Sequence, residues 1–196
     1  MNAHPIQLLS RDDLERTRLT VFFRLILWIP HGIWLGLWGI AVGFAVIVSW
    51  FATLFAGQTP DGLHNFIARY YRYQTQAFAY VLLLSDPYPG FLGDQPYPVD
   101  ASIAPPAPQN RWITGFRLII AIPVLIVAGV LNYLAEVIAI IAWFACLFTA
   151  RMPRGLESIG AWVLRFHLQT SAYISLLTDR YPAFAVEPTP EAGTQT

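Results

Sequence analysis

Glu136 has the most unusual setting of any ionisable residue in the chain, because it lies near the centre of a long apolar segment. Asn132 precedes it by about one helical turn. A carboxylate within a membrane is costly, so this position suggests a proton or cation site. In the structural alternatives, Glu136 is protonated, is bonded to Asn132 or to an arginine of a neighbouring helix, or marks with Asn132 a break in the helix.

A second polar set occurs twice. Its members are Arg72, Gln76 and Asp86 in the first half of the chain, and Arg165, Gln169 and Asp179 in the second. The arginine–glutamine pairs suit an anion or lipid-phosphate clamp, because a guanidinium group binds phosphate well. Alternatively, these pairs brace the two halves of the protein through the two aspartates.

Anchoring roles are expected for four further residues. Tyr88 and Tyr181 follow the aspartates in Asp-x-Tyr-Pro sequences, which fits a helix end with an aromatic ring at a membrane surface. Arg24 and Arg117 precede Pro30 and Pro123, and we expect their guanidinium groups to extend to lipid headgroups. We find no catalytic, cofactor-binding or metal-ligand motif, which argues against an enzyme.

Composition indicates a membrane protein. The chain has 56% hydrophobic and only 12% charged residues, where a soluble domain carries about 25% charged residues. Its formal net charge is zero, which argues against a nucleic-acid partner.

An internal repeat organises the sequence. A shift of about 93 residues aligns residues 18–91 with 111–184 without a gap, and roughly four positions in ten are identical. Glu136 corresponds to Gly43, so this carboxylate is a feature of the second copy only. Residues 1–17 form an N-terminal segment, residues 92–110 a proline-rich linker, and residues 185–196 a tail that we expect to be disordered.

The shared motifs resemble a known family. Each copy contains Trp-Phe-Ala-x-Leu-Phe, then Pro-x-Gly-Leu, and then Leu-Leu-(Ser/Thr)-Asp-x-Tyr-Pro-x-Phe. These motifs resemble the bacterial membrane family catalogued as domain of unknown function 4389. The resemblance implies a small helical membrane protein of the kind common in actinobacteria, and it transfers no activity to particular residues.

Each copy should contain two helices. The first is a long apolar segment, from about Phe22 to Ala56 and from about Leu118 to Ala150, which exceeds the ~20 residues that span a bilayer. A kink at its proline or a strong tilt would accommodate the excess length. The second is an amphipathic segment, from about Gly62 to Ser85 and from about Gly155 to Thr178.

These patterns predict an all-α integral membrane protein with about four membrane-embedded helices, two from each repeat. An even number of crossings per repeat keeps matching arginines on one side of the membrane, with a pseudo-two-fold axis along the membrane normal. Two crossings with interfacial second helices is the alternative.

We expect a multi-pass protein of the bacterial cytoplasmic membrane that contacts lipids. It would act as a non-enzymatic scaffold or accessory subunit, with a membrane-protein partner or as a homo-oligomer, and with no cofactor. The alternative function is a small transporter, channel or lipid-binding protein that uses Glu136 and the stripe containing Arg72 and Arg165.

Overall fold

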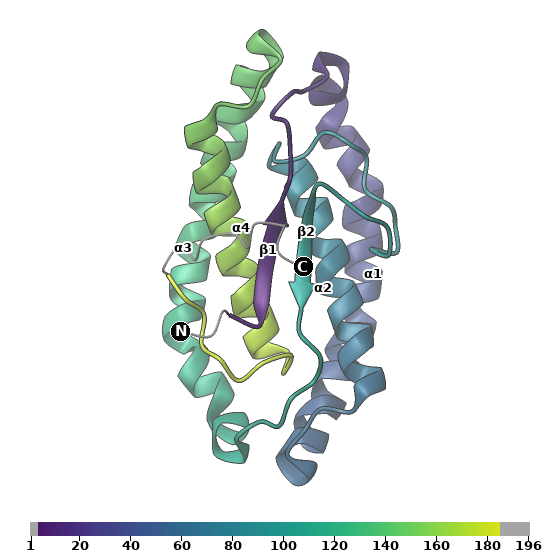
Figure 1. Ribbon diagram of the computed structural model, residues 1–196, viewed down its shortest axis with the longest axis vertical. Coiled ribbons are helices and arrows are strands. Elements are labelled where there is room, and N and C mark those ends of the chain that lie inside the picture. Colours follow the sequence, from purple (N-terminus) through teal and green to yellow (C-terminus); the bar gives the residue numbers. More distant parts are fainter. Residues whose placement is uncertain (1–3, 185–196) are drawn as a thin grey trace, which may run out of the picture.

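A computed structural model describes residues 4–184, which form four helices and two short strands (Figure 1). In chain order the elements are β1 (Ile6–Ser10), α1 (Arg18–Ala56), α2 (Asp61–Val81), β2 (Val99–Ile103), α3 (Arg111–Thr149) and α4 (Arg154–Ile174). The two tandem helical repeats, each with one long apolar helix and one shorter amphipathic helix, are confirmed. The tail from residue 185 lies outside the described residues.

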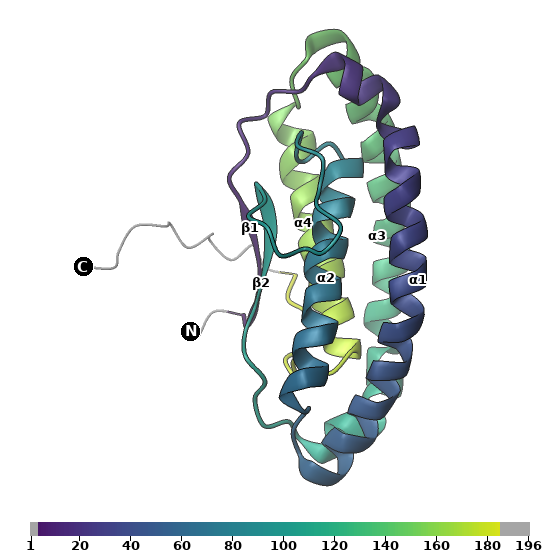
Figure 2. The ribbon, with the colours of Figure 1, turned by 90° about the vertical axis from the view of Figure 1, so that its right-hand side faces the viewer.

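Three layers make up the molecule (Figure 2). The long helices α1 and α3 form one outer layer, α2 and α4 form the middle layer, and the β1–β2 ribbon lies on the other side. The long helices are antiparallel, because residues at the beginning of each contact residues at the end of the other. The middle layer, α2 and α4, thus lies between the long helices on one side and the ribbon on the other.

The long helices distribute their side chains in the reverse of the usual pattern for a soluble protein. On α1 the buried residues include the polar Arg24, His31 and Ser49, while most of its large apolar side chains are exposed. On α3, likewise, Arg117 and Thr114 are buried, and most of the leucines, isoleucines and phenylalanines are exposed. Among the described residues, α1 and α3 alone are long and apolar enough to be candidate membrane spans. The structure thus offers two candidate spans where we expected about four embedded helices.

Neither internal proline ends its helix. Pro30 and Pro123 both lie inside continuous helices of 39 residues, each about 58 Å long. The predicted helices began a few residues too late, at Phe22 and Leu118, because charged and polar residues occupy the first turn of each.

Reciprocal contacts relate the two repeats. The indole N–H of Trp50 donates to the carbonyl of Thr114 at 2.9 Å, and that of Trp143 donates to the carbonyl of Val21 at 2.8 Å. Each of these residues has its counterpart in the other bond, at a separation of about 93 residues. An approximate two-fold axis between the repeats produces such paired contacts.

The ribbon corrects the prediction of an all-α fold. β1 and β2 pair antiparallel with Leu8 opposite Ala101, two residues that are equivalent by the repeat. Strand β2 lies within the segment predicted to be only a linker, and β1 lies within the N-terminal segment. Each repeat therefore begins with a strand, and the shared proline at Pro5 and Pro98 is the sequence signal for this extension.

Candidate functional site: a cavity between the helical layers

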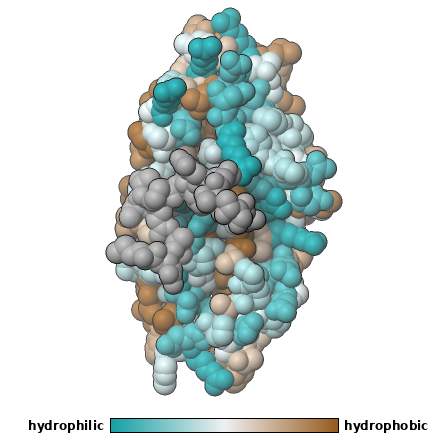
Figure 3. Space-filling model, in the orientation of Figure 1, coloured by the Kyte–Doolittle hydropathy of each residue, from teal (hydrophilic) through white to brown (hydrophobic). Residues whose placement is uncertain are grey.

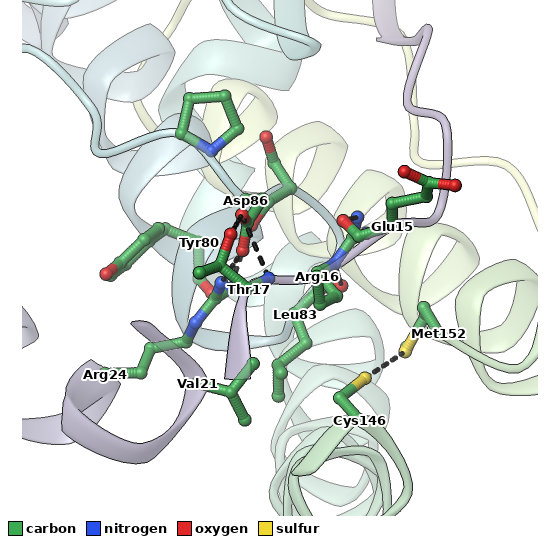
Figure 4. A network of polar contacts seen from close by, with 12 residues as sticks. Glu15, Arg16, Thr17, Val21, Arg24, Tyr80, Leu83, Asp86, Cys146 and Met152 are labelled. Carbon is green, nitrogen blue, oxygen red and sulfur yellow. Dashed lines mark hydrogen bonds and ion pairs between the residues drawn. The ribbon is translucent and has the colours of Figure 1, made fainter. Parts of the chain in front are cut away.

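Arg24 is the centre of a buried polar network at one end of the molecule (Figure 4). Its Nη1 donates to the carbonyls of Tyr80 at 2.5 Å and Ser85 at 2.8 Å, and its Nη2 donates to Asp86 at 2.8 Å. The guanidinium carbon also lies 4.3 Å from the centre of the Tyr80 ring. Arg24 thus donates to a carbonyl in the last turn of α2 and to one in the turn that follows, where a positive charge is favourable.

Arg117 repeats this arrangement at the other end. Its Nη1 donates to the carbonyls of Tyr173 and Thr178, and its guanidinium carbon lies 4.7 Å from the Tyr173 ring centre. Its Nη2 donates to the side-chain oxygen of Gln109 at 2.7 Å. The corresponding atom of Arg24 donates to the carboxylate of Asp86. The prediction that Arg24 and Arg117 extend to lipid headgroups is wrong, since both side chains are buried and bonded to protein. The partner carbonyls lie in the last turn of the second helix of the repeat and in the turn that follows it. The sequence of the long helix alone does not reveal these partners.

The turns after α2 and α4, which the two buried arginines contact, share an unusual backbone conformation. Leu83 and Leu176 both adopt positive φ angles, of 58° and 60°. The N–H of Leu84 bonds to the carbonyl of Ala79, and that of Leu177 bonds to the carbonyl of Ala172, as in a Schellman motif. A leucine in this conformation is strained, so the surrounding contacts must hold it.

Arg72 binds the ribbon. Its Nε and Nη2 donate to both carboxylate oxygens of Asp100 on β2, at 2.5–3.0 Å, and the hydrogen bonds to Asp100 raise the pKa of Arg72. Gln76 also donates to Asp100, at 3.1 Å. The predicted brace through Asp86 is therefore wrong for Arg72. The ion pair between Arg72 and Asp100 joins α2 to the ribbon. It was not predicted because Asp100 belongs to β2, a strand that was not expected from the sequence.

The second repeat holds its strand differently. Gln169, the counterpart of Gln76, donates to the carbonyl of Ile6 on β1 at 3.2 Å and accepts from the N–H of Ala183 at 3.0 Å. Arg165 is half-buried on the same helix. Both glutamines of the predicted stripe thus anchor strands, and a lipid-phosphate clamp at these residues is still a prediction.

Asp86 also caps α1. It accepts hydrogen bonds from the backbone N–H and the hydroxyl of Thr17, the N-cap residue, at 3.2 and 2.9 Å. A negative charge at the N-terminus of a helix stabilises the helix, because the helix dipole is positive at this end. At the equivalent end of α3, Asn110 caps the helix with its own side chain. The brace between the two halves of the protein that was expected at Asp179 is still a prediction.

The predicted aromatic anchors lie beside the long helices. Tyr88 is 44% exposed, and its hydroxyl donates to the carbonyl of Leu27 at 3.3 Å. Tyr181 is 40% exposed and packs edge-on against Tyr173. Both rings are therefore partly exposed, and their role at a membrane interface stays a prediction.

A cavity of about 750 Å³ lies among all four helices. Its walls are mainly apolar, with Phe78 from α2, Ala135 and Ala139 from α3, and Val163 and Leu164 from α4. Its exposed lining residues, Leu25, Asn132, Glu136 and Ile140, all belong to α1 or α3. The cavity therefore opens through the apolar outer layer.

Glu136 and Asn132 lie at this opening. The side-chain amide of Asn132 donates to the carboxylate of Glu136 at 2.9 Å, within an unbroken helix. This contact agrees with one structural alternative for Glu136, the bond to Asn132, and a break in the helix is excluded. The residue nonetheless lines a cavity, so a functional role is still a prediction.

The first repeat contains aromatic rings at the positions equivalent to two residues that line the cavity, Val163 and Leu164, and to Leu131, which precedes the lining residue Asn132. Trp38, Tyr70 and Tyr71 stand where the second repeat has Leu131, Val163 and Leu164. The Trp38 ring centre lies 5.7 Å from that of Tyr70, and the centres of Tyr70 and Tyr71 are 5.2 Å apart. Gly39, the counterpart of Asn132, makes room for Tyr70: a Cβ atom there would lie 3.0 Å from the Tyr70 hydroxyl.

Two polar atoms in the cavity walls stand out. Nε of Arg24 and Nε2 of His167 are buried and have no hydrogen-bond partner among the described residues. Burial lowers the pKa of His167, which favours its neutral form. The cavity was not predicted from the sequence, although the replacement of Tyr70 and Tyr71 by the smaller Val163 and Leu164 in the second repeat is a signal for it. The described residues contain no group of three His, Cys, Asp or Glu side chains that could hold a metal ion.

Comparisons with known proteins identify the repeats. No curated protein and no solved structure matches the chain. The family described as Domain of unknown function (DUF4389) matches twice, at residues 18–93 and 111–186. The two matched segments begin at the same residues as the two copies of the repeat and end two residues later. The chain therefore belongs to the DUF4389 family, as a tandem of two copies.

Proposed function

We propose that this protein is a non-enzymatic membrane platform that lies flat in one leaflet of the bacterial cytoplasmic membrane. The observation that carries this proposal is the segregation of its surface. Most large exposed apolar side chains of the described residues belong to α1 and α3, and α2 and α4 contribute only Phe66 and Ile159. The others lie in the segments that follow α2 and α4, at Tyr88, Phe91, Leu92, Tyr181 and Phe184. A face of this kind suits the acyl region of a bilayer.

The opposite face suits water. Figure 3, which looks onto the ribbon side, shows hydrophilic residues over most of the visible surface and apolar residues mainly toward the edges. Arg72 and Asp100 lie on this side of α2, in a partly exposed ion pair. A protein that crossed the membrane through all four helices would instead require an apolar belt around its whole circumference.

Helix length supports the flat arrangement. Exposed apolar side chains on α1 extend from Leu19 to Phe55, a distance of roughly 54 Å along the helix. The hydrocarbon core is only about 30 Å thick. Lying in the plane of the leaflet covers the whole face with lipid, and it keeps the pseudo-two-fold axis along the membrane normal. This arrangement replaces the four crossings expected from the sequence.

The platform would present the ribbon to a protein partner. β1 and β2 form a two-stranded sheet, so the outer edge of each strand has no strand partner among the described residues. Free strand edges are common docking sites for another chain. An accessory subunit that holds a partner against the membrane fits these two faces.

Vesicle flotation tests the proposal. The purified protein should float with vesicles of phosphatidylglycerol and phosphatidylethanolamine in 1 M salt (about a 3 Å screening length), because its binding is mainly apolar. Replacing Ile40 and Ile126 with aspartate should abolish flotation, since both are exposed on the long helices. Ile159→Asp on α4 is the matched control and should float normally. A lipid-free dimer that never floats would mean that the apolar face binds a second copy instead.

Lipid binding is a second candidate function, and the cavity is the observation that favours it. Its opening lies on the proposed lipid face, so a molecule from the bilayer has direct access.

A further inference from the structure

We propose that the cavity binds a single-chain lipid of the fatty-acid class, with its carboxyl or ester head inside the protein. This inference rests on the proposed membrane location, which brings the opening into contact with lipid. The platform function does not require a ligand in the cavity, so the two proposals can be tested separately.

The shape fits one acyl chain. The α3 residues that line the cavity extend from Asn132 to Trp143, which is roughly 17 Å along the helix. The volume of about 750 Å³ lies within the range of about 300–1,000 Å³ usual for small-molecule sites. Phe78, Val163 and Leu164 supply the apolar walls that a chain would contact.

The polar groups favour a hydrogen-bond acceptor as the head. Arg24 Nε can only donate, and His167 Nε2 can donate in one tautomer. Both lack a partner among the described residues, and a buried polar atom without a partner is costly. A carboxyl or ester carbonyl would satisfy such a donor, whereas a hydrocarbon would not.

Charge favours a neutral or weakly charged head over a phosphate. Asp86 already neutralises Arg24 at 2.8 Å, and Glu136 stands at the opening. A lipid phosphate would approach this carboxylate without a free cationic partner. A protonated fatty acid or an ester avoids that repulsion.

A variant that fills the cavity can be designed from the first repeat. Val163→Tyr combined with Asn132→Gly places the Tyr70 and Gly39 pair of the first repeat at the equivalent positions of the second. The new ring should occupy the cavity without unfolding the protein, because the same pair packs between α1 and α2. Val137→Tyr is the matched control, since Val137 is exposed on α3 and does not line the cavity.

Photolabelling in vesicles tests the inference. A diazirine-bearing palmitic acid is incorporated, irradiated and mapped by mass spectrometry. Labelling of α2 and α4 residues such as Phe78 and Leu164 should be saturable and should be removed by excess oleic acid or methyl oleate, but not by the hydrocarbon octadecene or by lysophosphatidic acid. The double variant should lose this labelling at least tenfold, while Val137→Tyr keeps it.

Labelling of the outer face distinguishes the two proposals. Exposed residues such as Phe44 should label without saturation if α1 and α3 lie in lipid. Outer-face labelling without cavity labelling would overturn the ligand and leave the platform intact. Unchanged saturable labelling in the double variant would also overturn the ligand site. Loss of outer-face labelling would contradict the membrane location itself.

The head position has its own readout. His167→Leu should weaken competition by oleic acid roughly tenfold, through loss of one buried hydrogen bond. His167→Gln, the residue of the first repeat at Gln74, should restore most of it. Equal competition in all three proteins would exclude His167 from the head site.

Discussion

The two repeats share one structural framework and differ in what fills it. Both contain a buried arginine below the end of the second helix, a tryptophan that bonds to the opposite long helix, and a glutamine that anchors a strand. They diverge where Tyr70 and Tyr71 in the first repeat are replaced by Val163 and Leu164 beside the cavity. The shared residues maintain the fold, and the divergent ones are where a specific function would arise.

Removal of the buried arginines should give the largest effect. Arg24→Met should lower the free energy of unfolding by about 3–5 kcal/mol, because it removes the charged partner of Asp86 and a charged donor to the carbonyls of Tyr80 and Ser85. Arg117→Met should cost less, about 1.5–3 kcal/mol, because Gln109 carries no charge. Denaturant titration in detergent measures both.

Arg154→Met is the control for these variants, since Arg154 is exposed at the start of α4. It should leave the free energy of unfolding unchanged. An equal loss at Arg154, or a larger loss for Arg117 than for Arg24, would refute the difference between the two networks.

The tryptophans test the symmetry of the framework. Trp50→Phe and Trp143→Phe each remove one hydrogen bond between the long helices and should each cost about 1 kcal/mol. Equal losses in thermal unfolding would support the pseudo-two-fold relation. A large loss at one position with none at the other would contradict it.

Strand anchoring should show a smaller effect. Asp100→Ala removes the partner of Arg72, whose side chain is 33% exposed, so we expect a loss of no more than about 1 kcal/mol. Hydrogen exchange should nevertheless become faster in β2. Gln169→Ala should do the same to β1, and Ser102→Ala, at an exposed position of β2, should change neither.

pH dependence should give the smallest effect. Burial lowers the pKa of His167 in the folded protein, so the unfolded chain binds the proton more readily. Stability should therefore fall as pH decreases below about 6.5. His167→Gln should reduce this fall between pH 7.5 and 5.5 in thermal unfolding, and an unchanged pH profile would contradict the assignment.

Much of the fold followed from local sequence patterns. The two repeats and the four helices were predictable because apolar periodicity and matching motifs are properties of neighbouring residues. The ribbon was not predicted, because its strands are only five residues long and pair across most of the first repeat. Pro5 and Pro98 were a usable signal for it.

The candidate site was less predictable. Glu136 and Asn132 were singled out from the sequence, and they do contact each other. The cavity beside them depends on which side chains of four helices converge, and periodicity does not specify that. Arg24 was placed at a lipid headgroup because its partners, Tyr80 and Ser85, are distant in the chain.

The most direct test of the flat arrangement is a nitroxide scan along α1 in vesicles. Spin labels at Leu19, Ile33, Phe44 and Phe55, all exposed, are introduced into a Cys146→Ala background. A flat platform predicts similar depths at all four positions, with high accessibility to oxygen and low accessibility to a polar nickel complex. Labels that are deep at Ile33 and Phe44 but in water at Leu19 and Phe55 would contradict the account and show that α1 crosses the membrane.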